Sequence, residues 1–184
     1  FDVGDAEDAD SVQIQIASDQ VNEIRHLISS KTLEIFTSTG EFFLKPQVSK
    51  PITPTDIQII RQSSLGVQEK AMPKRFDGAT IFIQNNGKTV REFFFNSGSE
   101  EFTSNSISLL SSHLIDTPVD SATITSIGER TEQFYFLVNT DGTMGVFTSQ
   151  RAEKIAGWVL WTTDGTYESV ACTTGNIYAV VKRT

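Results

Sequence analysis

The sequence contains one cysteine and two histidines among its 184 residues. A single cysteine, Cys172, excludes an internal disulfide, and its alternating SVACTT context favours a small buried thiol over a nucleophile. Neither His26 nor His113 has a Cys or His neighbour at ligand spacing, so the sequence predicts no zinc site and no cofactor. No apolar run approaches the roughly 20 residues that a membrane-spanning helix needs, so no membrane anchor is expected.

Residue patterns that support catalysis are also missing. There is no Ser-His-Asp order, no Gly-rich phosphate loop and no HExxH sequence. Four glutamates could act as glycosidase acids, but they lie in polar sequence without an apolar pocket to raise one pKa: Glu100, Glu101, Glu129 and Glu132. The acids at positions 2, 5, 7, 8 and 10 lack the spacing of a calcium-binding EF-hand loop. The sequence therefore predicts that the protein is not an enzyme and holds no metal.

The net charge of −8 is concentrated at the start of the chain. The first ten residues, FDVGDAEDAD, contain five acids, and the remaining residues have 18 acids against 15 bases. A protein that grips nucleic acid without sequence preference needs a basic stripe, so we expect no tight nucleic-acid binding. The acidic start differs from a signal peptide, and because the first residue is Phe1, we expect a fragment or an excised domain of a longer protein.

Short runs of β-branched and aromatic residues alternate with polar residues along most of the chain. This period of two predicts strands at residues 12–16, 23–29, 33–37, 41–44, 79–84, 89–95, 133–139, 143–149, 155–161, 167–173 and 177–183. Asn86 and Gly87 predict a primed hairpin turn, which needs positive φ angles. Only residues 104–114 have the apolar spacing of a helix, and residues 46–54 and 63–78 are expected to be irregular. The prediction is an all-β fold with one short helix near 104–114.

Five residues are candidates for contacts with a partner. Arg61 and Arg91 lie in or beside strands rich in apolar residues (IIRQ and VREF), where a long cation needs a carboxylate or backbone carbonyls at its head. Each could remain solvated, pair across strands or contact a partner. Trp158, Trp161 and Tyr167 could stack on sugar rings, which makes a glycan- or receptor-binding β domain an alternative function.

Seven segments, in order, resemble one family of viral proteins. They are DQVNEIRHL (19–27), LEIFTSTGEFFL (33–44), ITPTDIQIIRQSSLG (52–66), ATIFIQNNGKTVREFFF (79–95), SLLSSHL (108–114), FYFLVNTDGTMGVFT (134–148) and GWVLWTTDGTYESVACTTG (157–175), followed by IYAVVKR. Their order is similar to that in the tail nozzle, or tail tubular B-type, proteins of podoviruses (short-tailed bacteriophages) and their prophage relatives. Leu65 departs from the pattern, because an aromatic residue is expected after RQSS.

The resemblance implies a structural virion protein of the tail, present in the host cytoplasm during assembly. It implies a propeller-like arrangement of short antiparallel strands in residues 19–184, after an acidic lead-in and first strand at 1–18, with blades near 23–60, 79–102 and 122–182. Three to four blades do not close a ring of six or seven, so a partial propeller is expected. The implied partners are other tail or portal proteins and further copies in a homo-oligomeric ring, acting in tail assembly, DNA passage and genome ejection.

Overall fold

The computed structural model describes residues 16, 21–45, 53–54, 57–125 and 132–183, and these residues form an all-β protein, as predicted. Within them, fourteen strands make four antiparallel sheets, and the helical elements are two single turns of 3-10 helix, η1 (Ser112–Leu114) and η2 (Arg151–Glu153). The strand predicted at 12–16 and the acidic lead-in lie outside the described residues, apart from Ile16.

Three of the sheets contain four strands each, and neighbours in the chain are neighbours in the sheet. The first sheet comprises β1 (Ile24–Ser29), β2 (Leu33–Thr37), β3 (Glu41–Leu44) and β4 (Ile59–Ser63). The second comprises β5 (Lys74–Phe76), β6 (Ala79–Ile83), β7 (Val90–Asn96) and β8 (Glu101–Ser106). The third comprises β9 (Asp120–Ile124), β10 (Phe134–Val138), β11 (Met144–Gln150) and β12 (Ile155–Trp161). The terminal hairpin pairs β13 (Thr166–Thr173) with β14 (Asn176–Lys182).

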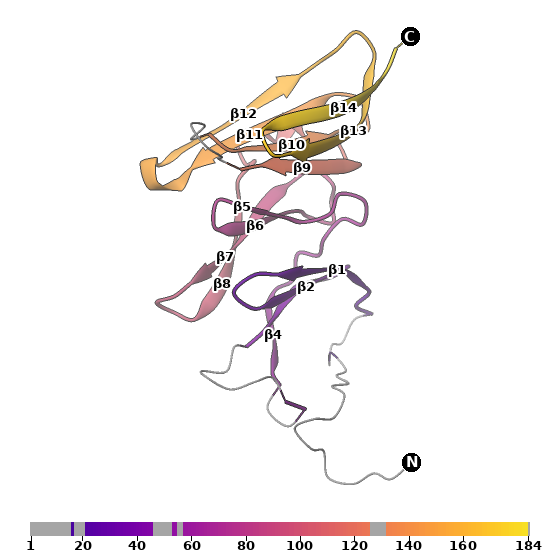
Figure 1. Cartoon of the computed structure of the whole chain (residues 1–184). Coiled ribbons are helices and arrows are strands. Elements are labelled where there is room, and N and C mark those ends of the chain that lie inside the picture. The colour runs from indigo at the N-terminus through magenta and orange to yellow at the C-terminus, as the bar shows by residue number, and fades with distance from the viewer. Residues whose placement is uncertain (1–15, 17–20, 46–52, 55–56, 126–131, 184) are drawn as a thin grey trace.

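The sheets are stacked along the molecule, from the first sheet to the terminal hairpin (Figure 1). Their first strands begin at residues 24, 74, 120 and 166, so the unit recurs after 50, 46 and 46 residues. Strands in equivalent positions approach one another: β5 contacts β9, β9 contacts β13, and β4 contacts β8. The chain is therefore built from one recurring unit, a four-stranded antiparallel meander, which occurs three times and is begun a fourth time by the terminal hairpin.

Apolar side chains fill each of the three spaces between stacked sheets. In β10, Tyr135 and Leu137 pack toward the second sheet, whereas Phe136 and Val138 pack toward the terminal hairpin. A strand covered on both faces needs apolar residues at every position, which explains its FYFLV sequence. The space between the first and second sheets is mainly aromatic, with Phe36, Phe43, Phe82, Phe93 and Phe102 buried in it. Fully burying one such side chain contributes roughly 1.5–3 kcal/mol.

The helix predicted over residues 104–114 is wrong, except for the single 3-10 turn at Ser112–Leu114. The first part of the segment instead extends β8, which ends at Ser106. Pairing with β7 continues beyond that strand, because Ile107 N–H donates to Val90 O at 3.0 Å and Val90 N–H donates to Ser108 Oγ at 2.9 Å. Serine favours such local hydrogen bonds over a helix interior, so sheet pairing prevails over a weak helical periodicity.

Ten of the predicted strands are confirmed within the described residues, with ends shifted by at most two positions. Of the other four strands, β4 (IIRQS) was expected only as the apolar strand in or beside which Arg61 lies. The remaining three were not predicted: β5 (KRF), β8 (EFTSNS) and β9 (DSATI). They are short or polar, so their sequences lack the β-branched and aromatic alternation that identifies a strand. The region expected as one unit at 122–182 divides into most of the third sheet and the terminal hairpin.

The hairpin between β6 and β7 turns at Asn86 and Gly87, but the predicted primed turn is wrong. A primed type I turn needs two positive φ angles, whereas only Gly87 has one, of 68°. Gly87 N–H donates to Gln84 O at 2.9 Å. Asn86 Oδ1 accepts from the N–H groups of Lys88 at 2.9 Å and Thr89 at 3.1 Å. The asparagine side chain therefore stabilises the turn, and the glycine supplies the left-handed residue.

Replacing Gly87 with valine is expected to lower the free energy of unfolding by about 1–2 kcal/mol, because a β-branched residue is strained at this φ. A Cβ at this position would also lie 3.3 Å from Thr117 Oγ1. Urea denaturation followed by fluorescence measures the change. Gly157→Val in β12 is the control, because no atom lies within 4 Å of a Cβ built there. An equal effect in both variants would contradict the strain at Gly87.

Candidate functional site

The structure places both candidate arginines in hydrogen bonds within their own sheets. Arg61 Nη2 donates to Thr39 O at 3.1 Å and Nε donates to Ser63 O at 3.4 Å, which ties the β2–β3 turn to β4. Arg91 Nε donates to Gln84 Oε1 at 2.7 Å, and its Nη1 donates to Ser104 O at 3.2 Å. Arg61 therefore binds two backbone carbonyls, whereas Arg91 binds one backbone carbonyl of β8 and one side-chain amide.

The three aromatic candidates do not form one surface. Residues opposite each other on paired strands share a face, and Trp158 is opposite Phe147, whereas Trp161 is opposite Met144. Trp158 faces the second sheet, with its indole N–H donating to Ile107 O at 2.8 Å. Trp161 is on the other face, with its ring 5.8 Å from that of Phe136. Tyr167 packs on the same cluster as Phe136, so only Trp161 and Tyr167 lie on one side of the third sheet.

The RQSSLG sequence at residues 61–66 joins the first sheet to the second. Gln62 Oε1 accepts the N–H of Phe102 in β8 at 3.2 Å, and Ser63 Oγ donates to the carboxylate of Glu41. The carbonyl of Gly66 accepts the N–H of Asn85 at 2.9 Å. This part of the segment expected to be irregular is therefore a junction that contacts both sheets with side chains and backbone.

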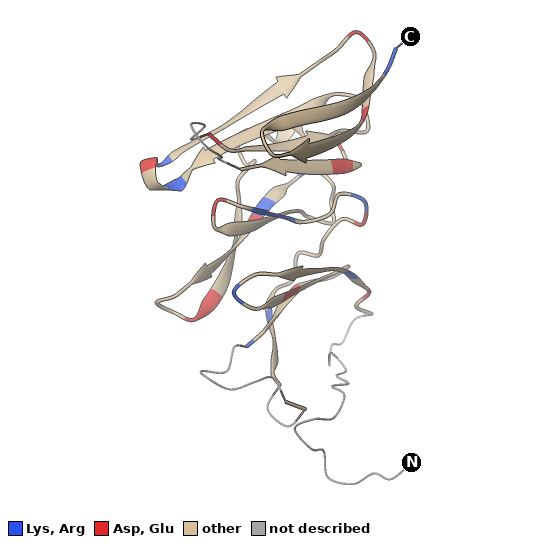
Figure 2. Ribbon diagram, viewed as in Figure 1, with Lys and Arg blue, Asp and Glu red and all other residues tan. Residues whose placement is uncertain are grey.

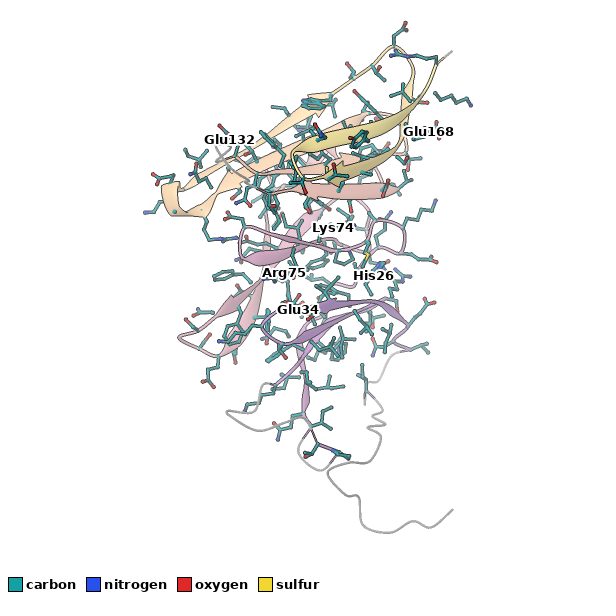
Figure 3. The ribbon with its side chains drawn as sticks, in the orientation of Figure 1. His26, Glu34, Lys74, Arg75, Glu132 and Glu168 are labelled. Atoms are coloured by element: carbon teal, nitrogen blue, oxygen red, sulfur yellow. The ribbon has the colours of Figure 1, made fainter. Side chains whose placement is uncertain are left out.

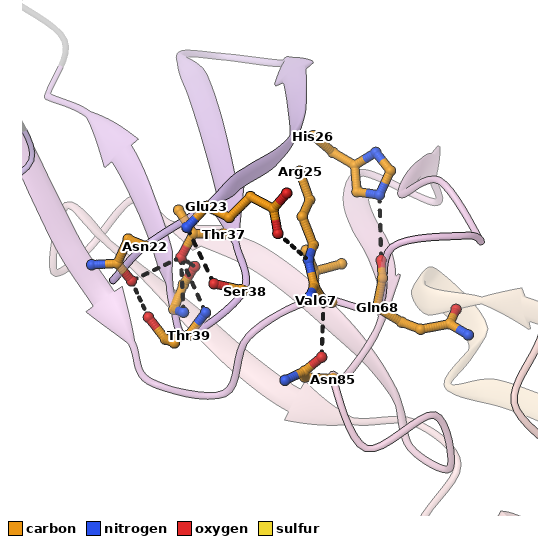
Figure 4. A network of polar contacts seen from close by, with 11 residues as sticks. Asn22, Glu23, Arg25, His26, Thr37, Ser38, Thr39, Val67, Gln68 and Asn85 are labelled. Carbon is orange, nitrogen blue, oxygen red and sulfur yellow. Dashed lines mark hydrogen bonds and ion pairs between the residues drawn. The ribbon is translucent and has the colours of Figure 1, made fainter. Parts of the chain in front are cut away.

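A network of polar contacts surrounds this junction (Figure 4). Arg25 from β1 donates to the carbonyl of Val67 and, at 2.9 Å, to Asn85 Oδ1 in the β6–β7 turn. His26 Nε2 lies 3.3 Å from the carbonyl of Gln68. Val67 is buried, and its N–H donates to Thr37 O at 2.9 Å. Hydrogen bonds from β1 and β2 therefore hold the backbone at Val67 and Gln68, in the segment between the first sheet and β5.

Glu34 is a buried carboxylate between the first and second sheets. It projects from β2 toward Arg75 of β5, whose Nη1 lies 3.5 Å from Glu34 Oε1 (Figure 3). Burial raises the pKa of Glu34, and the hydroxyls of Ser30 and Thr80 and the charge of Arg75 oppose this only in part. The carboxylate links two sheets across a mainly apolar space.

Glu41 in β3 is the second buried carboxylate of this space. Burial is also the main cause that raises its pKa, against a hydrogen bond from Ser63 and the charge of Arg91. The sequence analysis did not identify either acid. The LEIFT sequence did contain a signal for Glu34. Glu34 lies two residues before Phe36, so the alternation of a strand places both side chains on the same face.

Replacing Glu41 with glutamine is expected to weaken the pH dependence of stability. A raised folded-state pKa means that the folded protein binds more protons than the unfolded chain above about pH 4.5, the ordinary glutamate value. The contribution of Glu41 is therefore full below that pH and is lost as the pH rises through the folded-state pKa. Urea denaturation between pH 4 and 8 should show a smaller decline with pH in the variant than in the parent chain.

The matched control is Glu101→Gln, at an exposed position in β8. It removes one negative charge from the same half of the molecule without altering a buried carboxylate. The Glu101 variant should keep the parent's decline with pH. A steeper decline in the Glu41 variant than in the parent would contradict the raised pKa.

A cleft of about 330 Å³ opens between the second and third sheets beside η2. Apolar side chains of Phe76, Ile81, Ile107 and Phe147 are among those that line it. Three of its four charged lining residues are held together, since Arg151 Nη2 lies 2.7 Å from Glu92 Oε2 and Asp77 Oδ2 accepts from Arg151 N–H and from the hydroxyl of Ser149. The cleft therefore offers a ligand mainly apolar surface rather than reactive groups.

The largest group of exposed apolar side chains lies at the end of the stack. It comprises Ile155, Val159, Leu160 and Trp161 of β12, with Ile177, Tyr178 and Val180 of β14. Charged residues are almost absent from these two strands, and Figure 2 shows both ribbons in tan, the colour of uncharged residues, along most of their length. These side chains project from both faces of the two strands, and so many exposed apolar groups favour contact with further protein. We call these seven residues the terminal apolar surface.

The described residues contain no cluster of three or more histidine, cysteine or acidic side chains that could hold a metal ion. Burial raises the pKa of the Cys172 thiol despite the nearby charge of Lys74, so this cysteine is a poor nucleophile at neutral pH. Glu100, Glu101 and Glu132 are exposed, and Glu129 lies outside the described residues. Among the same residues, no helix is long and apolar enough to cross a membrane. Comparisons of the chain with models of protein families and with curated proteins find no match.

Proposed function

We propose that this chain is part of a structural protein of a bacteriophage tail, of the tail nozzle or tail tubular B type. The observation that carries the proposal is the stack of antiparallel meanders in chain order, recurring after 50, 46 and 46 residues. A propeller blade is also a four-stranded meander, of about 40–45 residues. Contacts between equivalent strands of successive sheets are those of adjacent blades, which supports a partial propeller.

The ordered sequence segments that resemble this family coincide with the parts of the chain that build the stack. ATIFIQNNGKTVREFFF forms the hairpin of β6 and β7, and the RQSSLG sequence forms the junction between two sheets. Polar side chains of these segments, such as Gln62 and Arg91, hydrogen-bond to the backbone of β8 and so hold strands together. This stabilising role is the one expected of a structural protein. The terminal apolar surface supplies a place for assembly with further protein.

Mass spectrometry of purified virions tests the tail function. Peptides of this chain should be recovered from intact particles and should follow the tail when capsids and tails are separated. In native mass spectrometry, the intact protein with its tail and portal partners should form a ring, whereas the 184-residue chain should be mainly monomeric. Abundant protein in infected cells without incorporation into virions would contradict the proposal.

A protein that lets DNA slide through a tail should not grip phosphate. The 184-residue chain is therefore expected to bind duplex DNA negligibly at physiological salt, because its net charge is −8 and adsorption depends on phosphates neutralised by Lys and Arg. Fluorescence anisotropy of a labelled duplex, measured at two salt concentrations, tests this. Tight, salt-sensitive binding would point to a nucleic-acid-binding protein instead.

Binding of a glycan or receptor is the second candidate function, and the exposure of Trp161 favours it. Trp161 is 42% exposed and lies on the same side of the third sheet as Tyr167, so its ring could stack on a sugar, whereas the indole N–H of Trp158 donates to the carbonyl of Ile107. A glycan array distinguishes the two candidates. A hit that is lost in Trp161→Ala and kept in Trp158→Phe would support glycan binding.

A further inference from the structure

The terminal hairpin has two strands where each earlier sheet has four. Strand β13 occupies the first position of the unit, because it packs on β9 as β9 packs on β5. Strand β14 then occupies the second position. Within the described residues, no strand occupies the third or fourth position above the third sheet. The fourth unit is therefore half complete in this part of the chain.

The face of the third sheet that packs under the hairpin is apolar, and it is uncovered along β12. On β11, Met144 and Val146 are buried under the hairpin. Their partners on β12 are Trp161 and Val159, which share that face but are 42% and 54% exposed. Ile155 lies four residues before Val159 in β12, on the same face, and is also exposed. Coverage of the sheet stops between β11 and β12.

The outer edge of β14 is likewise unprotected in the part of the chain that the structure describes. Strand β14 pairs only with β13, along Asn176–Lys182. Soluble proteins protect such an edge with charges, proline or a bulge, but NIYAVVK has a single charge at its end. Tyr178 and Val180 are 59% and 60% exposed. An apolar strand of this length with a free edge is ready to pair with another strand.

We propose that two further antiparallel strands of the same polypeptide complete this sheet. The third strand follows β14 through a hairpin turn and pairs with its free edge. The fourth strand lies outside the third, and apolar residues at alternate positions pack on Val159 and Trp161. The same polypeptide is the source because, in all three complete sheets, spatial order equals chain order. The inference rests on strand arrangement alone, so it does not depend on the tail function.

The test compares the 184-residue chain with a chain extended by the next roughly 25 residues of its coding sequence, enough for two strands and their turns. Both are made with Trp158→Phe, so that Trp161 is the only tryptophan. The extension should shift Trp161 emission to shorter wavelength and reduce its quenching by acrylamide. Hydrogen exchange of the β14 amides should slow by about tenfold or more. The reverse variant, Trp161→Phe, is the control, because Trp158 faces the second sheet and should not respond.

Three outcomes would overturn the proposal. The coding sequence could stop after Thr184 or continue without two apolar-alternating segments. The extension could leave Trp161 and β14 as accessible as before. The 184-residue chain alone could protect β14 in a concentration-dependent manner, which would identify a second copy as the occupant. None of these results bears on virion incorporation, so failure of this inference and failure of the tail function are separable.

Discussion

Gly66→Ala is expected to lower the free energy of unfolding by about 2–4 kcal/mol, one of the two largest effects predicted for this protein. Gly66 has a φ of +69°, and a Cβ built on it would lie 2.2 Å from the carbonyl oxygen of Ser38. The backbone cannot move away easily, because Gly66 O accepts from Asn85 N–H and Val67 N–H donates to Thr37 O. The substitution therefore forces the junction between the first two sheets to open. Chemical denaturation measures the loss.

The matched control for Gly66 is Gly78→Ala in the β5–β6 turn. Gly78 has a similar φ of +77°, but nothing lies within 4 Å of a Cβ built on it. Its variant should lose only about 1 kcal/mol, the cost of the left-handed backbone. The difference between the two variants isolates the clash with Ser38. Equal losses of unfolding free energy in the two variants would mean that the backbones at Gly66 and Ser38 can move apart at little cost.

Phe93→Ala is expected to cost about 3–5 kcal/mol, because it leaves a cavity in the aromatic space between the first and second sheets. Phe93 is fully buried, its ring stacks on Phe102 with centroids 4.4 Å apart, and Phe36 lies 5.6 Å away. These rings come from β2, β7 and β8, so rearrangement of a single strand cannot fill the space. Thermal and chemical denaturation should both show the loss.

The adjacent residue provides the control for Phe93. Phe94 is only partly buried, and the guanidinium of Arg151 lies 4.8 Å from its ring centroid. Phe94→Ala should cost about 1 kcal/mol, from lost contact with this cation and a small loss of burial. A larger loss of unfolding free energy in Phe94→Ala than in Phe93→Ala would mean that Phe94, rather than Phe93, faces the space between the first and second sheets.

Strand positions were largely predictable because they depend on short-range alternation. LEIFT, VREFFFN and FYFLV each contain enough β-branched and aromatic residues to exclude a stable loop, and each forms a strand. The position of the turn at Gly87 was equally local, since glycine readily supplies a positive φ, but the turn type was predicted wrongly. Polar strands such as β8 were missed because their pairing partner, rather than their own sequence, makes them strands.

The candidate site was less predictable, because it depends on which strands stack. The sequence placed Trp158 and Trp161 three residues apart in one strand and so on opposite faces, but only the stacking of the sheets determined that Trp158 faces the second sheet. Burial of Glu34 and Glu41 follows from the second sheet covering the first, over a separation that no local pattern reports. Likewise, Arg61 was expected to need a carboxylate or backbone carbonyls, and the fold determined that the carbonyls of Thr39 and Ser63 supply this contact.

The sequence by itself determined that the chain is all-β, has one cysteine and carries its strongest negative charge at its start. These properties are local or additive, so no knowledge of distant contacts is needed to derive them. The tertiary structure alone decided that the strands group into stacked four-stranded units and that, within the described residues, the fourth unit has two strands. Val159 and Trp161 are exposed because the two strands of the terminal hairpin do not extend over β12. Their own sequence is apolar and does not report whether another strand packs on them.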